Sequence, residues 1–141
     1  MLESFGAHVF DNVFENNTYG VRLSVGSAHN VFHRNEVINS IKYNFFTYEG
    51  SDDPDVVDSG RSQNNTFFNN TVTGARESIK LKEADGTTFQ ENSFINVTTI
   101  RFDNAAETLM VGNTGLEDIE LKVVGGACFD ADSDSAFQPT C

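Results

Sequence analysis

The sequence predicts an all-β fold, a parallel β-helix of about five coils with about 22 residues each. Two observations predict it: one short motif recurs at nearly constant spacing, and a strand-like motif follows each copy. One unit of this length cannot bury its apolar side chains alone, whereas stacked units bury them together. A β-sandwich is the alternative, but it does not require a constant period.

The recurring motif is clearest in TFFNNTV at 66–72 and TFQENSF at 88–94. An apolar residue precedes an asparagine by three positions in Val9/Asn12, Phe32/Asn35, Phe67/Asn70, Phe89/Asn92 and Met110/Asn113. The asparagines are 23, 35, 22 and 21 residues apart. The long interval contains EGSDDPDVVDSGRSQ, which predicts an acidic loop inserted at 49–64. Amides repeated at a turn favour a hydrogen-bonded ladder over a ligand site.

The second motif reads GVRLS, NFFTY, SIKLK, TIRFD and DIELK. Apolar and polar residues alternate in it, as in a strand whose side chains point to opposite faces in turn. Aligned, the copies give an inner column of Val21, Phe45, Ile79, Ile100 and Ile119 and a second one of Leu23, Thr47, Leu81, Phe102 and Leu121. We therefore expect these columns to be buried, with Lys80 and Arg101 on the outer face.

The coils are expected to fill residues 1–127 as one domain, followed by a tail at 128–141. Cys128 and Cys141 flank this tail, and a disulfide between them would close it. The cysteines and the glycosylation sequons at Asn16, Asn64, Asn69 and Asn96 favour a secreted, extracellular protein. No signal peptide and no apolar run long enough to span a membrane is visible.

The chain begins almost inside a coil, without the capping element that solenoids usually need. We therefore expect either a monomer or, more readily, part of a longer β-helix.

The formal net charge is −12, which argues against nucleic acid as a partner, because phosphate binding requires a basic surface. The outer strand face differs from this negative net charge, because it carries cationic and aromatic residues. It is expected to present Arg22, Phe46, Tyr48, Lys80, Lys82 and Arg101. Cations that bind carboxylates and aromatic rings that offer apolar faces suit a long anionic ligand. The alternative is an ordinary solvated strand face.

Several segments carry a family resemblance: YGVRLSVGSAHNVFHRN, YEGSDDPDVVDSGRSQNNTFFNNTV, ESIKLKEADGTTFQENSF and TTIRFDN. They resemble the mannuronan C-5-epimerases of brown algae, from about Tyr19 to the cysteine-ended tail. The resemblance implies a right-handed parallel β-helix. The resemblance implies a cell-wall polyuronate, alginate or polymannuronate, as substrate and C5-epimerisation as the reaction. The family's Asp-Pro-His-Asp signature is absent; the nearest string is DDPDVVD at 52–58. The chain thus resembles the distal substrate-binding coils of such an enzyme, and no catalytic residue is assigned.

Epimerisation would need a cation that neutralises the uronate carboxylate and two groups that move a proton on opposite faces. The acid–base candidates are Tyr19, Tyr43, Tyr48, His8, His29 and His33. Among these, only Tyr48 is expected beside a groove cation, Arg22. The alternatives are a non-catalytic polysaccharide-binding module, a structural solenoid and a polyuronate lyase.

No cofactor is predicted. The string DADSDS at 130–135 resembles the start of a calcium loop but lacks the glycine and glutamate that an EF-hand needs at its sixth and twelfth positions. Calcium is therefore expected, if at all, to arrive with the polyuronate.

Overall fold

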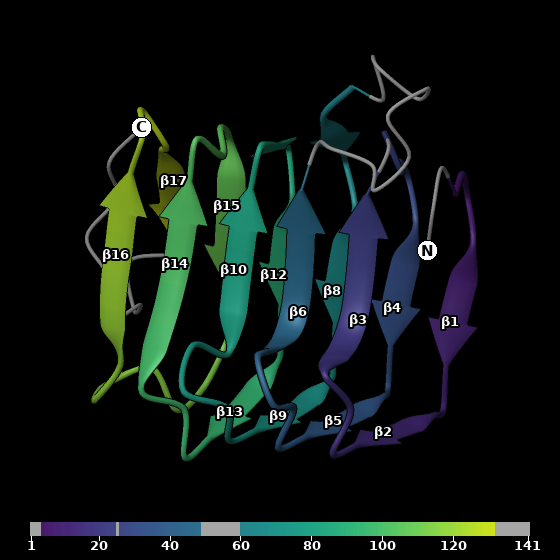
Figure 1. The fold of residues 1–141 in the computed structure, drawn as a ribbon, viewed down its shortest axis with the longest axis vertical. Helices are drawn as coiled ribbons and strands as arrows, with labels where there is room; N and C mark the ends of the chain where they lie inside the picture. The colour runs from purple at the N-terminus through teal and green to yellow at the C-terminus, as the bar shows by residue number, and fades with distance from the viewer. Residues whose placement is uncertain (1–3, 25, 49–59, 132–141) are drawn as a thin grey trace.

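A computed structural model describes residues 4–24, 26–48 and 60–131 of the chain. The described residues contain strands and no helix, and the strands stack in parallel into a β-solenoid of about five turns. Figure 1 shows a sheet of long strands in front, a second sheet behind it and a third across the lower side. The predicted parallel β-helix is thus confirmed as an architecture.

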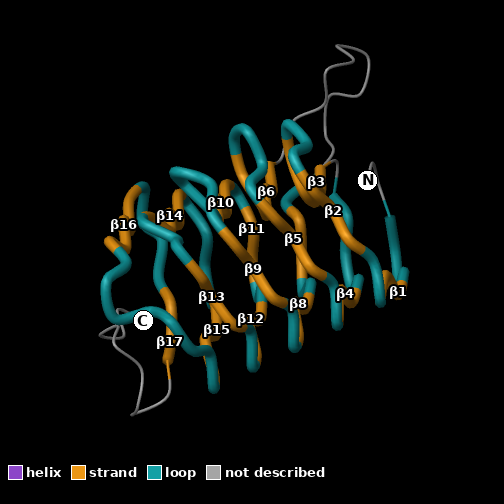
Figure 2. The backbone as a smooth tube through the Cα atoms, turned by 90° about the horizontal axis from the view of Figure 1, so that it is seen from below, coloured by secondary structure: helices purple, strands orange, loops and turns teal. Residues whose placement is uncertain are grey.

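Each of the first four coils contributes one strand to each of the three main sheets, and the fifth contributes to the front and back sheets (Figure 2). The front sheet contains β3 (Tyr19–Ser24), β6 (Tyr43–Tyr48), β10 (Ile79–Lys82), β14 (Thr99–Asp103) and β16 (Glu120–Val124). The back sheet contains β1 (His8–Phe10), β4 (Val31–His33), β8 (Thr66–Phe68), β12 (Thr88–Gln90), β15 (Thr108–Val111) and β17 (Phe129–Ala131). The lower sheet contains β2 (Val13–Glu15), β5 (Glu36–Ile38), β9 (Thr71–Thr73) and β13 (Ser93–Ile95). A short pair is formed by β7 (Ser62–Gln63) and β11 (Ala84–Asp85).

The interior is a column of stacked side chains. The rings of Phe32, Phe67 and Phe89 follow one another along the back sheet with centroids 5.2 and 5.0 Å apart. Phe45 of the front sheet packs against Phe67 at 4.4 Å. Burial of this column stabilises the stacking of successive coils, because each ring is removed from water only when its neighbours are present.

The predicted inner columns of the front sheet are buried. Ile79, Leu81, Ile100 and Phe102 are each fully inaccessible to solvent. The last coil differs from the predicted alignment, because Ile100 pairs with Leu121 and not with Ile119. Ile119 is still buried, in the turn before β16, whereas Leu121 is only partly covered at the end of the stack.

The observed pairing of the last coil is shifted by two residues from the predicted one. Because side chains alternate along a strand, a two-residue shift leaves each side chain on its predicted inner or outer face. The outer neighbour of Arg101 is therefore Lys122 and not Glu120, which pairs with Thr99. The asparagine spacing contained the signal: Leu121 follows Asn113 by eight residues, as Ile100 follows Asn92.

The predicted asparagine ladder is present at the turn between the back and lower sheets. Side-chain amide to side-chain oxygen distances of 3.0–3.2 Å join Asn12, Asn35, Asn70, Asn92 and Asn113 in sequence. A second ladder that the sequence pattern did not reveal joins Asn30 to Asn65 at 3.0 Å, at the start of the back sheet. The motif asparagines therefore hold the coils in register.

The tight turns use residues with positive φ. All four sequon asparagines have φ between 52° and 56°, and all four side chains are exposed: Asn16, Asn64, Asn69 and Asn96. Asparagine tolerates this left-handed conformation better than most residues. Turn geometry thus accounts for these asparagines independently of any glycan.

The predicted loop at 49–64 and tail at 128–141 are only partly described. Ser62 and Gln63, at the end of the loop, form β7, and Phe129, near the start of the tail, is buried in β17. Residues 49–59 and 132–141 lie outside the described residues. The Cys128–Cys141 disulfide involves Cys141 and therefore stays a prediction.

Within the described parts of the chain, no helix has the length and apolar character required to cross a bilayer.

Candidate functional site

The candidate site is the outer face of the front sheet. Parallel in-register pairing places Arg22, Phe46, Lys80, Arg101 and Lys122 side by side, one from each successive strand. Adjacent strands of a sheet are about 4.8 Å apart, so this row presents evenly spaced groups along the coil axis. Four of the six predicted binding residues belong to this row.

The other two predicted residues, Tyr48 and Lys82, lie two positions further along their strands. Tyr48 pairs with Ser24, and Lys82 pairs with Asp103. All six predicted side chains are partly exposed. Each of the six side chains is therefore partly covered by neighbouring residues, which restricts its motion.

Four aromatic rings cover the first two strands of this face. Phe46 stacks on Tyr19 at 5.3 Å and on Tyr48 at 5.6 Å, with interplanar angles of 16° and 3°. Tyr43 contacts Phe46 at 4.9 Å and Tyr19 at 6.0 Å. The rings form a continuous apolar platform, and the tyrosine hydroxyls at its margin accept hydrogen bonds from cations.

Arg22 lies against this platform. Its Nη2 atom donates a 2.9 Å hydrogen bond to the Tyr48 hydroxyl, and its guanidinium carbon lies 4.9 Å from the centre of the Tyr48 ring. The same guanidinium carbon lies 5.6 Å from the centre of the Tyr19 ring. Cation–π contact and hydrogen bonding together orient the guanidinium. The sequence prediction that Arg22 and Tyr48 lie close together is thus met in the structure.

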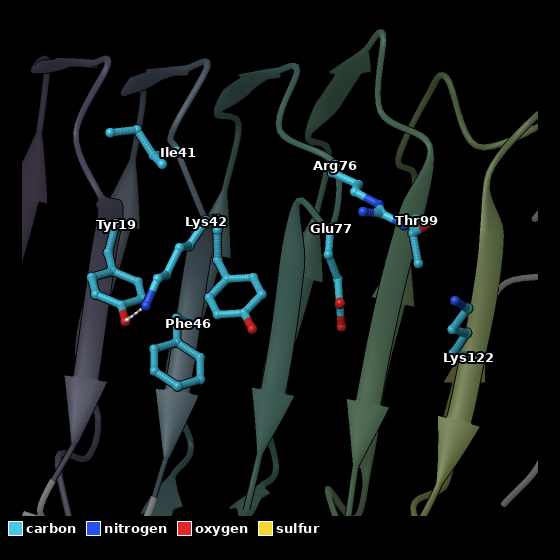
Figure 3. A pocket seen from close by; sticks show the side chains of 9 residues that line it. Tyr19, Ile41, Lys42, Phe46, Arg76, Glu77, Thr99 and Lys122 are labelled. Atoms are coloured by element: carbon cyan, nitrogen blue, oxygen red, sulfur yellow. Dashed lines mark hydrogen bonds between the residues drawn. The ribbon is translucent and has the colours of Figure 1, made fainter.

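Two lysines contact tyrosine hydroxyls in the same region. Lys42 Nζ lies 3.4 Å from Tyr19 Oη (Figure 3). Lys80 Nζ lies 3.3 Å from Tyr43 Oη. Beside them is an open hollow of about 480 Å³, lined by Tyr19, Ile41, Lys42, Tyr43, Phe46, Arg76, Glu77, Thr99 and Lys122.

The sequence pattern assigned neither Tyr19, Tyr43 nor Lys42 to the binding face. Strict alternation from Phe45, which points inward, would turn Tyr43 inward as well. The backbone N–H groups of Asn44 and Phe45 instead both donate to Ser78 O, at 2.8 and 3.0 Å, as at a β-bulge. Such a bulge inserts one residue and reverses the alternation, so Tyr43 faces outward.

Gly20 makes room for this bulge on the neighbouring strand. A Cβ atom there would clash with Val37 Cγ1 and lie 2.6 Å from Asn44 O. The Tyr-Gly pair at 19–20 was the available sequence signal.

Acidic residues enter the face over its later coils. Arg101 lies 3.9 Å from Glu77 and 3.6 Å from Asp103, and Lys122 lies 3.6 Å from Glu120. Lys82 Nζ is 3.9 Å from Glu83. These partly exposed pairs contribute little to stability, but they offset local positive charge. By contrast, among the described residues no carboxylate lies within 4.0 Å of Lys42 or Lys80 Nζ.

The histidines lie elsewhere. His8 and His33 are on the back sheet, with ring centroids 6.3 Å apart, and His29 is in the turn before β4. None of the three histidines lies on the front sheet beside Tyr48 and Arg22. Within the described parts of the chain, no group of three or more histidine, cysteine or acidic residues could hold a metal ion. Residues 132–135 of the string DADSDS lie outside those parts.

The clearest pKa perturbation is also away from the front sheet. Asp11, in the turn between β1 and β2, accepts hydrogen bonds of 2.8 and 2.9 Å from Arg34. This hydrogen-bonded guanidinium lowers the pKa of Asp11 below 3.8 and raises the pKa of Arg34.

Comparisons with protein-family models, curated proteins and solved structures found no match to this chain.

Proposed function

We propose that this chain binds an anionic polysaccharide of the alginate or polymannuronate type along the front sheet. The observation that carries the proposal is the combination of an in-register row of cations with a stacked aromatic platform. This combination occurs on a protein of net charge −12, whose average surface would repel a polyanion. Carboxylates would pair with the cations, and pyranose rings would lie on the aromatic faces.

The resemblance to mannuronan C-5-epimerases extends the proposal to chemistry. In C5-epimerisation the proton next to the carboxylate is removed, so a cation must offset the charge that develops. Arg22, oriented by Tyr48, is the strongest candidate for this task, and Tyr48 is the nearest proton-transfer candidate. We propose that the chain acts as the substrate-binding coils of an epimerase-like, extracellular protein.

A non-catalytic binding module is the second candidate. The observation in its favour is the absence of Asp-Pro-His-Asp from the sequence. Both candidates require polyuronate binding, and a purely structural solenoid does not.

Calorimetric titration with polymannuronate and with a neutral glucan tests the binding proposal. We expect measurable binding of the polyuronate alone, weakening as salt is raised, because exposed charge pairs are screened. Replacing Lys80 and Arg101 together by glutamate should abolish binding and preserve the fold, since both side chains lie on the outer face. Unchanged affinity of the folded double variant would place the ligand on another surface.

A further inference from the structure

We infer that two tyrosine–lysine pairs on successive coils, Tyr19–Lys42 and Tyr43–Lys80, form adjacent carboxylate-binding subsites for neighbouring sugar residues of one polyuronate chain. This inference rests on the proposed function. It adds three residues that the sequence pattern did not assign to the binding face: Tyr19, Lys42 and Tyr43.

The two pairs lie on successive coils and have similar distances. Tyr19 and Tyr43 are register partners on β3 and β6, with ring centroids 6.0 Å apart. In each pair a lysine from the next coil reaches back to the hydroxyl, at 3.4 Å for Lys42 and 3.3 Å for Lys80. Each ammonium also lies over the ring, 5.6 and 5.2 Å from its centre. One coil step thus relates the two tyrosines but not the two lysines, because the register partner of Lys80 is Phe46 and Lys42 lies just before β6.

The hydrogen-bond chemistry of a pair selects an anion. An ammonium group can only donate, so the tyrosine oxygen must accept from it. The phenolic proton is then directed away from the lysine and is available to a ligand. Each pair therefore offers a phenolic O–H and the remaining ammonium N–H groups, a donor set that suits a carboxylate.

The lysine contacts are also easily exchanged for a ligand. Distances of 3.3 and 3.4 Å exceed the usual 2.9–3.0 Å for an N–H···O bond, so the contacts are weak. Among the described residues, no acidic side chain lies within 4.0 Å of either ammonium group. An incoming carboxylate would gain a charge-assisted bond without breaking an internal ion pair.

The neighbouring groups define the direction of the site. Phe46 lies against both tyrosines, at 5.3 and 4.9 Å, and provides an apolar surface for sugar rings between the pairs. Toward the later coils the cation Arg101 is already flanked by Glu77 and Asp103. A polyanion should therefore be held most strongly over β3, β6 and β10.

The test uses mannuronate hexamer as the probe, neutral mannose hexamer as the ligand control, and calorimetry or fluorescence titration of the full chain. Lys42→Gln and Lys80→Gln should each weaken hexamer binding about tenfold, as expected for loss of one charge-assisted bond. Arg34→Gln is the matched control, because it removes one positive charge from another face. It should change affinity less than twofold. Thermal melts should show that all three variants are folded.

A second comparison separates a working pair from an isolated cation. Tyr43→Phe should weaken binding severalfold, and the Tyr43→Phe, Lys80→Gln double variant should bind nearly as Lys80→Gln does, because the two groups act as one unit. If the wild type binds the hexamer but folded Lys42→Gln and Lys80→Gln bind like Arg34→Gln, the subsites are wrong and the proposed function stands. If the wild type does not distinguish the mannuronate from the mannose hexamer, the proposed function itself fails.

Discussion

Asn70 shows how a single side chain connects three coils. Its oxygen accepts from the backbone and the side chain of Asn35, at 3.0 and 3.2 Å. Its amide nitrogen donates to Phe32 O at 2.9 Å and to the Asn92 side chain at 3.0 Å. The residue is 1% exposed, so water cannot replace these bonds.

We therefore expect Asn70→Ala to lower the free energy of unfolding by about 3 kcal/mol, because at least two buried groups lose their partners at roughly 1–3 kcal/mol each. A urea melt measures this difference. Asn12→Ala is the matched control. Because Asn12 is exposed at the end of the ladder, this substitution should lower the free energy of unfolding by about 1 kcal/mol or less. Equal losses for the two variants would contradict a cooperative ladder.

Asp11 gives a residue-scale test of electrostatics. Because Arg34 stabilises its charged form, the folded-state pKa lies below the unfolded value near 3.8. The associated stabilisation is present above about pH 4 and is lost as pH falls through the folded pKa. NMR titration of the Asp11 carboxyl carbon should show the lowered pKa, and Arg34→Gln should return it toward 3.8.

The effect on stability should be small, because both side chains are at least half exposed. An Asp11 pKa that is the same in the wild type and in Arg34→Gln would show that the pair is not formed in solution.

At the scale of the strand, in-register stacking determines which side chains are inside. Ile100 of β14 pairs with Ile79 on one side and Leu121 on the other, and it is fully buried. Ile100→Ala should lower the free energy of unfolding by about 2–5 kcal/mol through the cavity it leaves. Val13→Ala, at a position 63% exposed, should change it by less than about 0.5 kcal/mol. Similar urea midpoints for both variants would contradict the assigned faces.

Periodic features of these elements could be predicted from the sequence, and local irregularities could not. The asparagine ladder and the burial of Ile79 and Ile100 follow from a repeat, because each copy reinforces the same alignment. The outward turn of Tyr43 depends on one bulge whose shared acceptor, Ser78 O, comes from the next coil. Alternation within a single strand contains no trace of that contact. The pairing of Arg101 with Lys122 was missed because the last turn was aligned by its apolar pattern and not by its distance from Asn113.

At the scale of the whole molecule, the front face changes character along the coil axis. Its first coils carry the aromatic platform and the tyrosine–lysine pairs. Its later coils carry cations already flanked by acidic side chains, as at Arg101 and Lys122. A stack of nearly identical backbones can vary in this way because each coil contributes only its own outward residues. The ligand position is therefore set by side chains, while the spacing of subsites is set by the fold.

The same distribution leads to a prediction about activity. The face offers cations that can hold a uronate and acidify its C5 proton. Two groups must then move the proton, but among the described residues Arg22 is hydrogen-bonded to the hydroxyl of Tyr48 and contacts Tyr19 through its ring. We expect the chain by itself to epimerise polymannuronate poorly or not at all, since each missing acid–base group typically costs about 10²–10⁴ in rate. Incubation with polymannuronate in deuterated water, followed by NMR, would detect guluronate and deuterium at C5. Ultraviolet absorbance of the same sample would reveal an unsaturated product if the chain acted as a lyase. Turnover that survives Tyr48→Phe would remove Tyr48 from the reaction, and the proton-transfer groups would then have to be sought at Tyr19 and Tyr43.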